Sequence, residues 1–218
     1  MLEVGANMGA HTVKMAQAVE WGRVFAFEPQ RIIFQLLCAN VALNNLKNVE
    51  CHWAALGASN CLIEVQDLDP DRENNFGALP LNMGLPGRRI PCYAADEIFN
   101  FPRLDLIKID VEGMEKEVIE GAVDLIKQHQ PMLYVENDRI ENSEALMRLI
   151  DGLGYAMYWH TPPLFDTDNF YGKPEDIFGN VVSFNMVCAP EHMQKHFDMP
   201  KITDFTLHPI KSWQQAAA

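Results

Sequence analysis

Residues 1–29 restrict the fold more than any other part of the sequence. Residues 1–5 are an apolar run that ends in glycine, and residues 10–21 carry apolar side chains at helical spacing. Residues 23–27 are a second β-prone run, which stops at Glu28-Pro29. A strand, helix and strand joined by such short connections predict parallel strands with a crossover helix, and therefore an α/β fold.

The same alternation continues along the chain. A helix over 32–43 and a strand over 49–54 are predicted next, with a small extra strand over 61–65. Further on, the pattern predicts strands over 104–110, 131–136, 155–160 and 181–188, and helices over 114–128 and 143–153, the last one capped by Ser143. The two closing strands suit an antiparallel pair at the edge of an otherwise parallel sheet.

The length of 218 residues suits one domain. We assign residues 1–190 to it and residues 191–218 to a C-terminal tail. Residues 69–90 are rich in Asn, Gly, Pro and Asp, which predicts a long loop that is either a functional lid or a plain surface excursion. Residues 161–180 form a second polar loop, which is either an acceptor-binding loop or an ordinary one.

Charge and hydropathy exclude several classes of function. The formal net charge of −13, with no compensating Lys/Arg cluster, disfavours a nucleic-acid partner. No apolar run approaches the roughly 20 residues that cross a bilayer, and no basic-then-apolar leader is visible, so we expect no membrane association and a cytoplasmic location. The oligomeric state is left open, a homo-oligomer included.

Two neighbouring features predict a nucleoside site. Gly5 and Gly9 surround a tight strand-to-helix turn, where the backbone can approach a ligand closely. Their G-x-x-x-G spacing differs from the G-x-G-x-x-G of dinucleotide folds, which disfavours an NAD-dependent oxidoreductase. Glu28, at the carboxyl end of the next strand, can accept both hydroxyls of a ribose that lies across the sheet. The alternatives are a plain tight turn and a solvated strand end.

A third motif covers residues 105–115. Lys108 and Asp110 share one side of a strand because side chains repeat every two residues. A lysine inside an apolar strand is costly unless it is paired, so Asp110 or Glu112 is its expected partner. The pair is either structural or part of an active site. Asp110 ends the strand where open α/β sheets bind ligands, so we favour an active-site role for it.

Four segments in this order resemble the FkbM family of methyltransferases: residues 2–12, 25–29, 54–57 and 105–115. The resemblance implies a doubly wound, mostly parallel seven-stranded sheet with a reversed last strand, in the Rossmann-like methyltransferase fold. It also implies S-adenosylmethionine as the methyl donor, and O-methylation of a sugar or secondary metabolite. The expected partner is therefore a small-molecule or glycan hydroxyl acceptor.

The resemblance also assigns residues. It places Glu3, Gly5, Asn7 and Gly9 at the methionine end of the donor, Glu28 at the ribose and the Ala54–Ala55 turn around the adenine. The further residues expected to contact the donor are Ala6, Thr12, Pro29 and Asp110.

An alcohol acceptor must lose its proton as the methyl group arrives, which calls for a base or a metal. Asp110 is our first choice of base, and the other catalytic candidates are Lys108, Glu112, Glu136 and His160. Asp110, Glu136 and Asp138 could hold a divalent ion through oxygen ligands. Nothing in their spacing requires an ion, so we predict no metal.

Two departures from the family pattern leave alternatives open. Glu3 replaces the more usual aspartate, and this longer carboxylate is still expected to serve. Family members normally carry helices before the first strand, whereas this sequence begins at that strand. We therefore expect a truncated chain, a naturally open site or completion by a partner subunit. The alternatives to an O-methyltransferase are a donor-binding or scaffold subunit and an RNA or protein methyltransferase.

Overall fold

The computed structural model describes residues 1–66, 87–179, 181–193 and 197–210. They form one seven-stranded sheet in the order β3-β2-β1-β7-β8-β10-β9, and a second sheet of three strands in the order β4-β6-β5. The strands of the larger sheet are β1 (Leu2–Val4), β2 (Val24–Phe27), β3 (Val49–His52), β7 (Leu106–Ile109), β8 (Met132–Glu136), β9 (Tyr155–His160) and β10 (Asn185–Pro190). Those of the smaller sheet are β4 (Ala55–Leu56), β5 (Cys61–Val65) and β6 (Arg88–Tyr93).

The larger sheet is mostly parallel and doubly wound. Strand β10 alone runs antiparallel to both of its neighbours, β8 and β9. The chain moves outward from β1 to β2 and β3, and then returns to β7 on the other side of β1. The strand order therefore reverses between β1 and β7, and open α/β sheets bind ligands at such a switch point. The seven strands and the reversed last strand confirm the expected fold class.

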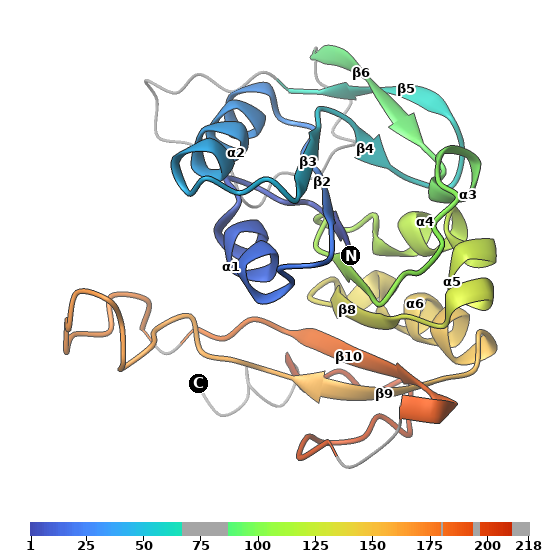
Figure 1. Ribbon diagram of the computed structural model, residues 1–218. Helices are drawn as coiled ribbons and strands as arrows, with labels where there is room; N and C mark the ends of the chain where they lie inside the picture. Colours follow the sequence, from blue (N-terminus) through green and yellow to red (C-terminus); the bar gives the residue numbers. More distant parts are fainter. Residues whose placement is uncertain (67–86, 180, 194–196, 211–218) are drawn as a thin grey trace.

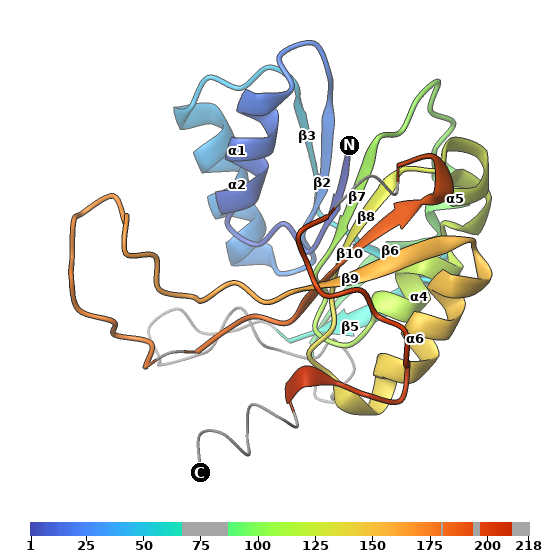
Figure 2. The ribbon, with the colours of Figure 1, turned by 90° about the horizontal axis from the view of Figure 1, so that it is seen from below.

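Helices cover both faces of this sheet. Figures 1 and 2 show α1 (Ala10–Ala18) and α2 (Arg31–Leu43) on one side, and α4 (Glu115–Glu120), α5 (Val123–His129) and α6 (Ile140–Gly152) on the other. The short helix α3 (Ala95–Ile98) follows β6, and the 3-10 helix η1 (Glu191–Met193) follows β10. None of the helices in the described ranges is both long and apolar enough to span a membrane.

The main core lies between the sheet and α4, α5 and α6. Its fully buried members come from both layers and include Ile107, Ile109, Ile119, Ile126, Leu133, Met147 and Ile150. A smaller core of Ala6, Ala26, Leu37 and Val41 joins α2 to β1 and β2. Burial of an aliphatic side chain stabilises the fold by about 1.5–3 kcal/mol. The main core therefore holds β7 and β8 firmly in place, because both strands contribute fully buried side chains to it.

The helix expected over 114–128 is wrong, because the chain breaks at Gly121 into α4 and α5. The Gly121 carbonyl accepts a 2.9 Å hydrogen bond from the Asp96 backbone N–H instead of continuing the helix. The Asp96 carboxylate also accepts hydrogen bonds from the N–H groups of Asp124 and Leu125, both 2.9 Å, which caps the start of α5. Apolar periodicity does not reveal such a cap from a distant residue.

Other boundaries also differ. Ser143 lies inside α6 and is not its cap, because the helix begins at Ile140 after Arg139. The strand expected over 49–54 ends at His52, and the following residues enter β4 of the smaller sheet. The loop expected over 69–90 lies mostly outside the described residues, and its last three residues belong to β6.

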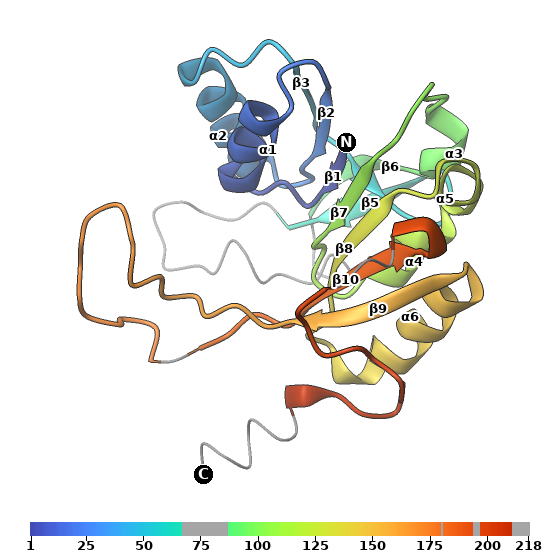
Figure 3. The same cartoon turned by 60° about the horizontal axis from the view of Figure 1, so that its bottom comes forward.

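The connection between β9 and β10 extends away from the body of the molecule (Figure 3). Its base continues the strand pairing, since the Leu164 N–H donates to the Val181 carbonyl at 2.9 Å. Farther out, Phe170 and Tyr171 are almost fully exposed. Residues 197–210, expected as part of a tail, pack back on the domain, where Ile202 joins the main core.

Candidate active site at the carboxyl ends of β1, β2 and β7

The glycine turn after β1 contains three left-handed residues. Gly5, Asn7 and Gly9 have φ values of 79°, 50° and 89°. Glycine adopts this region without strain and asparagine tolerates it better than most residues, which explains both glycines and the residue between them. A Cβ on Gly5 would lie 1.7 Å from the backbone oxygen of Asp110. Gly5 therefore allows the ends of β1 and β7 to meet at the switch point.

This close approach predicts a large stability loss for Gly5→Ala. The left-handed backbone would cost about 1–2 kcal/mol, and displacement of the Asp110 backbone about 1–3 kcal/mol more. Gly154 is the matched control, because its φ is 86° but a Cβ added there would have no neighbour within 4 Å. Urea unfolding should give a loss of roughly 2–5 kcal/mol for Gly5→Ala and only the first component for Gly154→Ala. Equal losses would contradict the close approach.

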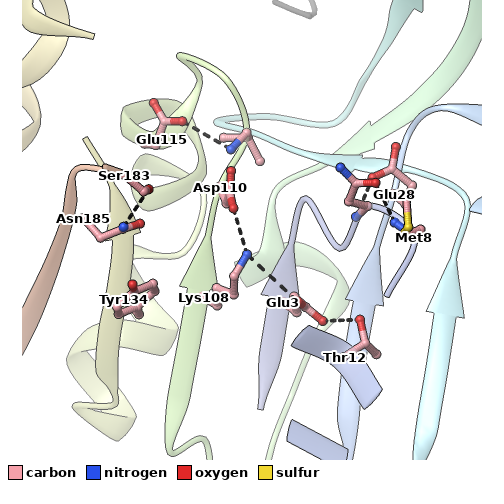
Figure 4. Close-up of polar contacts among 12 residues, drawn as sticks. Glu3, Met8, Thr12, Glu28, Lys108, Asp110, Glu115, Tyr134, Ser183 and Asn185 are labelled. Atoms are coloured by element: carbon pink, nitrogen blue, oxygen red, sulfur yellow. Dashed lines mark hydrogen bonds and ion pairs between the residues drawn. The ribbon is translucent and has the colours of Figure 1, made fainter. Parts of the chain in front are cut away.

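Glu28 lies immediately after β2 and is almost fully buried. Its Oε2 accepts the backbone N–H of Asn7 at 2.9 Å, and its Oε1 accepts that of Gln30 at 2.8 Å. Burial outweighs these hydrogen bonds and raises the pKa of Glu28 to about 7. Both oxygens are thus held in fixed positions beside the glycine turn (Figure 4), and each keeps a lone pair for a further donor.

Lys108 and Asp110 form the ion pair that the strand pattern predicts. Lys108 Nζ lies 3.0 Å from Asp110 Oδ2. The lysine side chain is 7% exposed and the aspartate side chain 35%, so the aspartate is the more accessible member of the pair. Glu3 has no exposed surface. Its expected contact with the donor is therefore not available in this conformation.

The loop after β7 is fixed from two directions. Glu112 has a left-handed φ of 56°, and its Oε2 lies 2.6 Å from the Arg139 guanidinium. The buried carboxylate of Glu115 accepts the N–H of Val111 at 3.2 Å and that of Gly113 at 3.0 Å. Glu112 therefore pairs with Arg139, and of the two expected partners of Lys108 it is Asp110 that forms the ion pair. Neither Arg139 nor Glu115 was predicted as a site residue, although both lie close to the candidate acids in the chain.

Three carboxylates meet at this end of the sheet. Asp110, Glu112 and Glu136 each offer an oxygen within 4.8 Å of the others. Burial, followed by the charges of Asp110, Asp138 and Glu112, raises the pKa of Glu136 to about 9. Burial and the neighbouring charges thus favour a proton shared within this group of acids at neutral pH. The three oxygens could hold a hard divalent cation or stabilise the positive charge of a ligand.

These acids predict how stability depends on pH. The pKa values of Glu3, Glu28 and Glu112 are about 7 and that of Glu136 is about 9, against 4.5 for an ordinary glutamate. Between pH 6.5 and 9 the folded protein therefore binds more protons than the unfolded chain. Its free energy of unfolding should fall as pH rises, by roughly 5 kcal/mol from these four groups, since one pKa unit is worth about 1.4 kcal/mol.

Urea unfolding at several pH values measures this fall. The lowered pKa values of the Met1 amino group, His11 and His52 oppose it, because the unfolded chain holds more protons on these groups. Glu136→Gln removes the largest contributor and should flatten the curve. A free energy of unfolding that stays level or rises between pH 6.5 and 9 would show that these carboxyls are not protonated in the folded protein.

His160 does not join the other catalytic candidates. It pairs in register with Asn185 of β10, which pairs in turn with Glu136 of β8. At about 4.8 Å per strand, His160 lies about 10 Å from Glu136 and farther from Asp110. Its Nδ1 lies 2.9 Å from the Tyr134 hydroxyl. Tyr134 is two residues before Glu136 on the same face of β8. The two-residue period of a strand could therefore have identified Tyr134 as a neighbour of the site from the sequence.

The residues expected around the adenine are buried. Ala54 packs in the main core and Ala55 in the core of the smaller sheet, so a ligand could reach only their backbone. Trp53, at the same bend, is 37% exposed, and its indole N–H donates to the Pro29 carbonyl at 2.9 Å. Trp53 was not predicted as a site residue, although it directly precedes the Ala54–Ala55 turn.

A cleft of about 780 Å³ lies at the opposite end of the sheet. Its lining includes Trp21 and Arg23, before β2, and Leu104 and Asp105, before β7. It therefore opens at the amino ends of these strands, away from the glycine turn and the carboxylates. We place the candidate active site at the carboxyl ends, where the chemistry-bearing side chains converge.

The sequence of this chain is similar to those of known methyltransferases. Residues 3–157 match the family model described as "Methyltransferase FkbM domain". Methyltransferase 1 of Beauveria bassiana (strain ARSEF 2860) is 23% identical over 146 residues, which cover 57% of this chain and 58% of that protein. Methyltransferase sdnD of Sordaria araneosa is 24% identical over 158 residues, which cover 56% of this chain and 60% of that protein. The chain thus matches under two thirds of the length of either relative.

Solved structures show the same fold. Methyltransferase FkbM from Methylobacillus flagellatus KT superposes with a TM-score of 0.53 at 18% identity, covering 86% of this chain and 42% of that one. Precorrin-6y C5,15-methyltransferase from Geobacter metallireducens GS-15 also gives a TM-score of 0.53, at 12% identity, covering 87% and 79%. At these identities the similarity concerns the architecture alone.

Proposed function

Because this chain belongs to the FkbM methyltransferase domain family, we propose that it transfers a methyl group from S-adenosylmethionine to a hydroxyl group of a sugar or secondary metabolite. The observation that carries this proposal is the row of groups along the carboxyl ends of three adjacent strands. Glu28 follows β2, the Gly5–Gly9 turn follows β1, and Asp110 follows β7.

The residues present fit the proposed donor. Glu28 has two fixed oxygens for the two hydroxyls of a ribose. The glycine turn leaves room for the backbone to approach the amino-acid end. Toward β7, the sulfur would lie on the side of Asp110, whose carboxylate is 35% exposed and open to an acceptor hydroxyl beside the methyl group. When bound, S-adenosylmethionine would supply an electrophilic methyl group for in-line displacement.

Asp110 is the best placed of the five catalytic candidates to act as the base. Its carboxylate is 35% exposed, and one oxygen is held by Lys108. Glu112 pairs with Arg139 at 2.6 Å, and burial, with the charge of Asp110, raises the pKa of Glu136 to about 9. Asp110 is therefore a carboxylate that can take the proton of an incoming hydroxyl while the fold aligns that hydroxyl with the methyl group.

Incubation with methyl-labelled S-adenosylmethionine and a panel of methyl glycosides and hydroxylated polyketides tests the proposal. We expect labelled product in which the methyl group is on oxygen, and Asp110→Asn as a control should lose it. Label on the nitrogen of a protein or on RNA would overturn the assignment to a hydroxyl acceptor. Donor binding without transfer to any panel member would favour a donor-binding subunit.

A further inference from the structure

Lys108 has an unusual position for a lysine. It lies in the middle of β7, paired in register with Glu3 of β1 on one side and with Tyr134 of β8 on the other. Its side chain is 7% exposed. An ammonium buried to this extent is costly unless carboxylates or hydrogen bonds compensate it.

Two carboxylates face this ammonium, as Figure 4 shows. Lys108 Nζ lies 3.0 Å from Asp110 Oδ2 and 4.0 Å from Glu3 Oε1. The other oxygen of Glu3 accepts a 2.5 Å hydrogen bond from the Thr12 hydroxyl. Glu3 and Thr12 have no exposed surface. The four side chains thus form one chain of contacts, here called the relay, from helix α1 to the carboxyl end of β7.

Asp110 is the most exposed of the four members, with its side chain 35% exposed, against 7% for Lys108. A ligand in the crevice could therefore contact Asp110 directly, but not Glu3 or Thr12, which have no exposed surface. Burial raises the pKa of Glu3 to about 7, against the opposing effects of Lys108 and Thr12. Glu3 Oε1 also has no hydrogen-bond partner among the described residues. The fold thus keeps a partly compensated buried acid at this position.

Such an arrangement is poor at stabilising a fold. Apolar residues of similar volume often replace a buried ion pair with no loss, or with a gain, of stability. The benefit of the relay must therefore lie in what it fixes. Because Lys108 hydrogen-bonds to Asp110 at 3.0 Å and lies 4.0 Å from Glu3 of β1, its position determines where the Asp110 carboxylate stands relative to β1 and the glycine turn.

We propose that Lys108 is a positioning residue that fixes the Asp110 carboxylate at the crevice, and that Glu3, held by Thr12, is a positioning residue for Lys108. The relay thus connects β1, which leads into the Gly5–Gly9 turn, with the proposed base Asp110. Glu3 therefore contributes to catalysis without touching the donor. The catalytic consequence rests on the proposed function, whereas the coupling between Glu3 and Lys108 does not.

The coupling can be measured without an acceptor. In protein labelled with ¹⁵N-lysine, a buried and hydrogen-bonded ammonium gives a ¹H–¹⁵N cross-peak protected from exchange with water. The Lys108 peak is identified by its absence from Lys108→Arg. We expect Glu3→Gln to shift this peak and increase its exchange rate at least threefold, with Thr12→Val changing it in the same direction. A peak unchanged by Glu3→Gln would overturn the proposal.

The catalytic consequence is tested by turnover with the labelled donor and the same glycoside and polyketide panel. Glu3→Gln is expected to lower kcat about tenfold, with the Kd for S-adenosylhomocysteine changed less than twofold. In the Lys108→Met background, Glu3→Gln should lower kcat no further, because the two residues act in series. Multiplied effects, or an equal loss of S-adenosylhomocysteine affinity, would contradict positioning through Lys108.

The two experiments fail separately. If wild-type protein transfers no methyl group, the proposed function fails, whereas the ammonium spectrum still tests the coupling between Glu3 and Lys108. If wild type is active but Glu3→Gln leaves both the spectrum and kcat unchanged, the relay fails while the proposed function stands. Glu50→Gln is the matched control, since this glutamate forms an exposed ion pair with Arg23.

Discussion

Asp110→Asn is expected to lower the rate of methyl transfer by about 10²–10⁴-fold, the usual contribution of a positioned acid or base. The asparagine keeps the shape of the side chain but cannot take a proton from the acceptor hydroxyl. The donor should still bind, because its ribose and amino-acid end are assigned to Glu28 and the glycine turn. Single-turnover measurement with labelled donor gives the rate, and calorimetry gives the donor Kd.

Asp105→Asn is the control for this substitution. Asp105 lies at the other end of β7, where it forms an exposed ion pair with Arg103 at 2.7 Å. We expect its rate to match that of the wild type. If Asp110→Asn instead weakened donor binding and left the rate of the bound complex unchanged, Asp110 would be a donor ligand and the base would have to be sought elsewhere in the site.

Glu28→Ala should weaken the binding of S-adenosylhomocysteine by about 10²–10⁴-fold. A hydrogen bond to a charged group is worth about 1.5–3 kcal/mol, and two ribose hydroxyls would be lost. Glu28→Gln retains one acceptor oxygen and should lose about tenfold. Calorimetric titration measures both variants, after circular dichroism has shown that they are folded. The removed carboxylate also accepts the N–H groups of Asn7 and Gln30, so this check is necessary.

Glu50→Ala is the comparison for Glu28→Ala. Glu50 lies on the neighbouring strand β3, and its side chain is 46% exposed. Its replacement should leave the affinity unchanged. Wild-type affinity in Glu28→Ala would remove the ribose assignment.

Much of the fold was predictable because strand and helix periods in this chain are regular. The crossover pattern of residues 1–54 and the apolar run that became β7 were enough to predict a parallel sheet. The errors arose where distant residues decide a boundary. Asp96 caps α5 from outside the helix, and Gly121 packs with its Cα side against Gly57, where a Cβ would lie 2.0 Å from the carbonyl oxygen. The apolar periodicity of one segment reveals neither the cap from Asp96 nor the packing of Gly121 against Gly57.

The candidate site was predictable in its residue types but not in their roles. The two-residue period of β7 placed Lys108 beside Asp110, and the ion pair is there. The same pattern could not show that Glu3 is fully buried beneath the crevice, because its depth depends on Thr12 and on the register of β1 with β7. Nor could it separate His160 from the carboxylates, since that depends on β10 entering the sheet between β8 and β9.

A crystal structure of the protein with S-adenosylhomocysteine tests the central claim most directly. Our account predicts the ribose hydroxyls on the Glu28 carboxylate, the amino-acid end against the Gly5–Gly9 turn, and the sulfur on the β7 side, nearest to Asp110. A nucleoside bound at another place, or Glu28 facing away from the ribose in the complex, would contradict it.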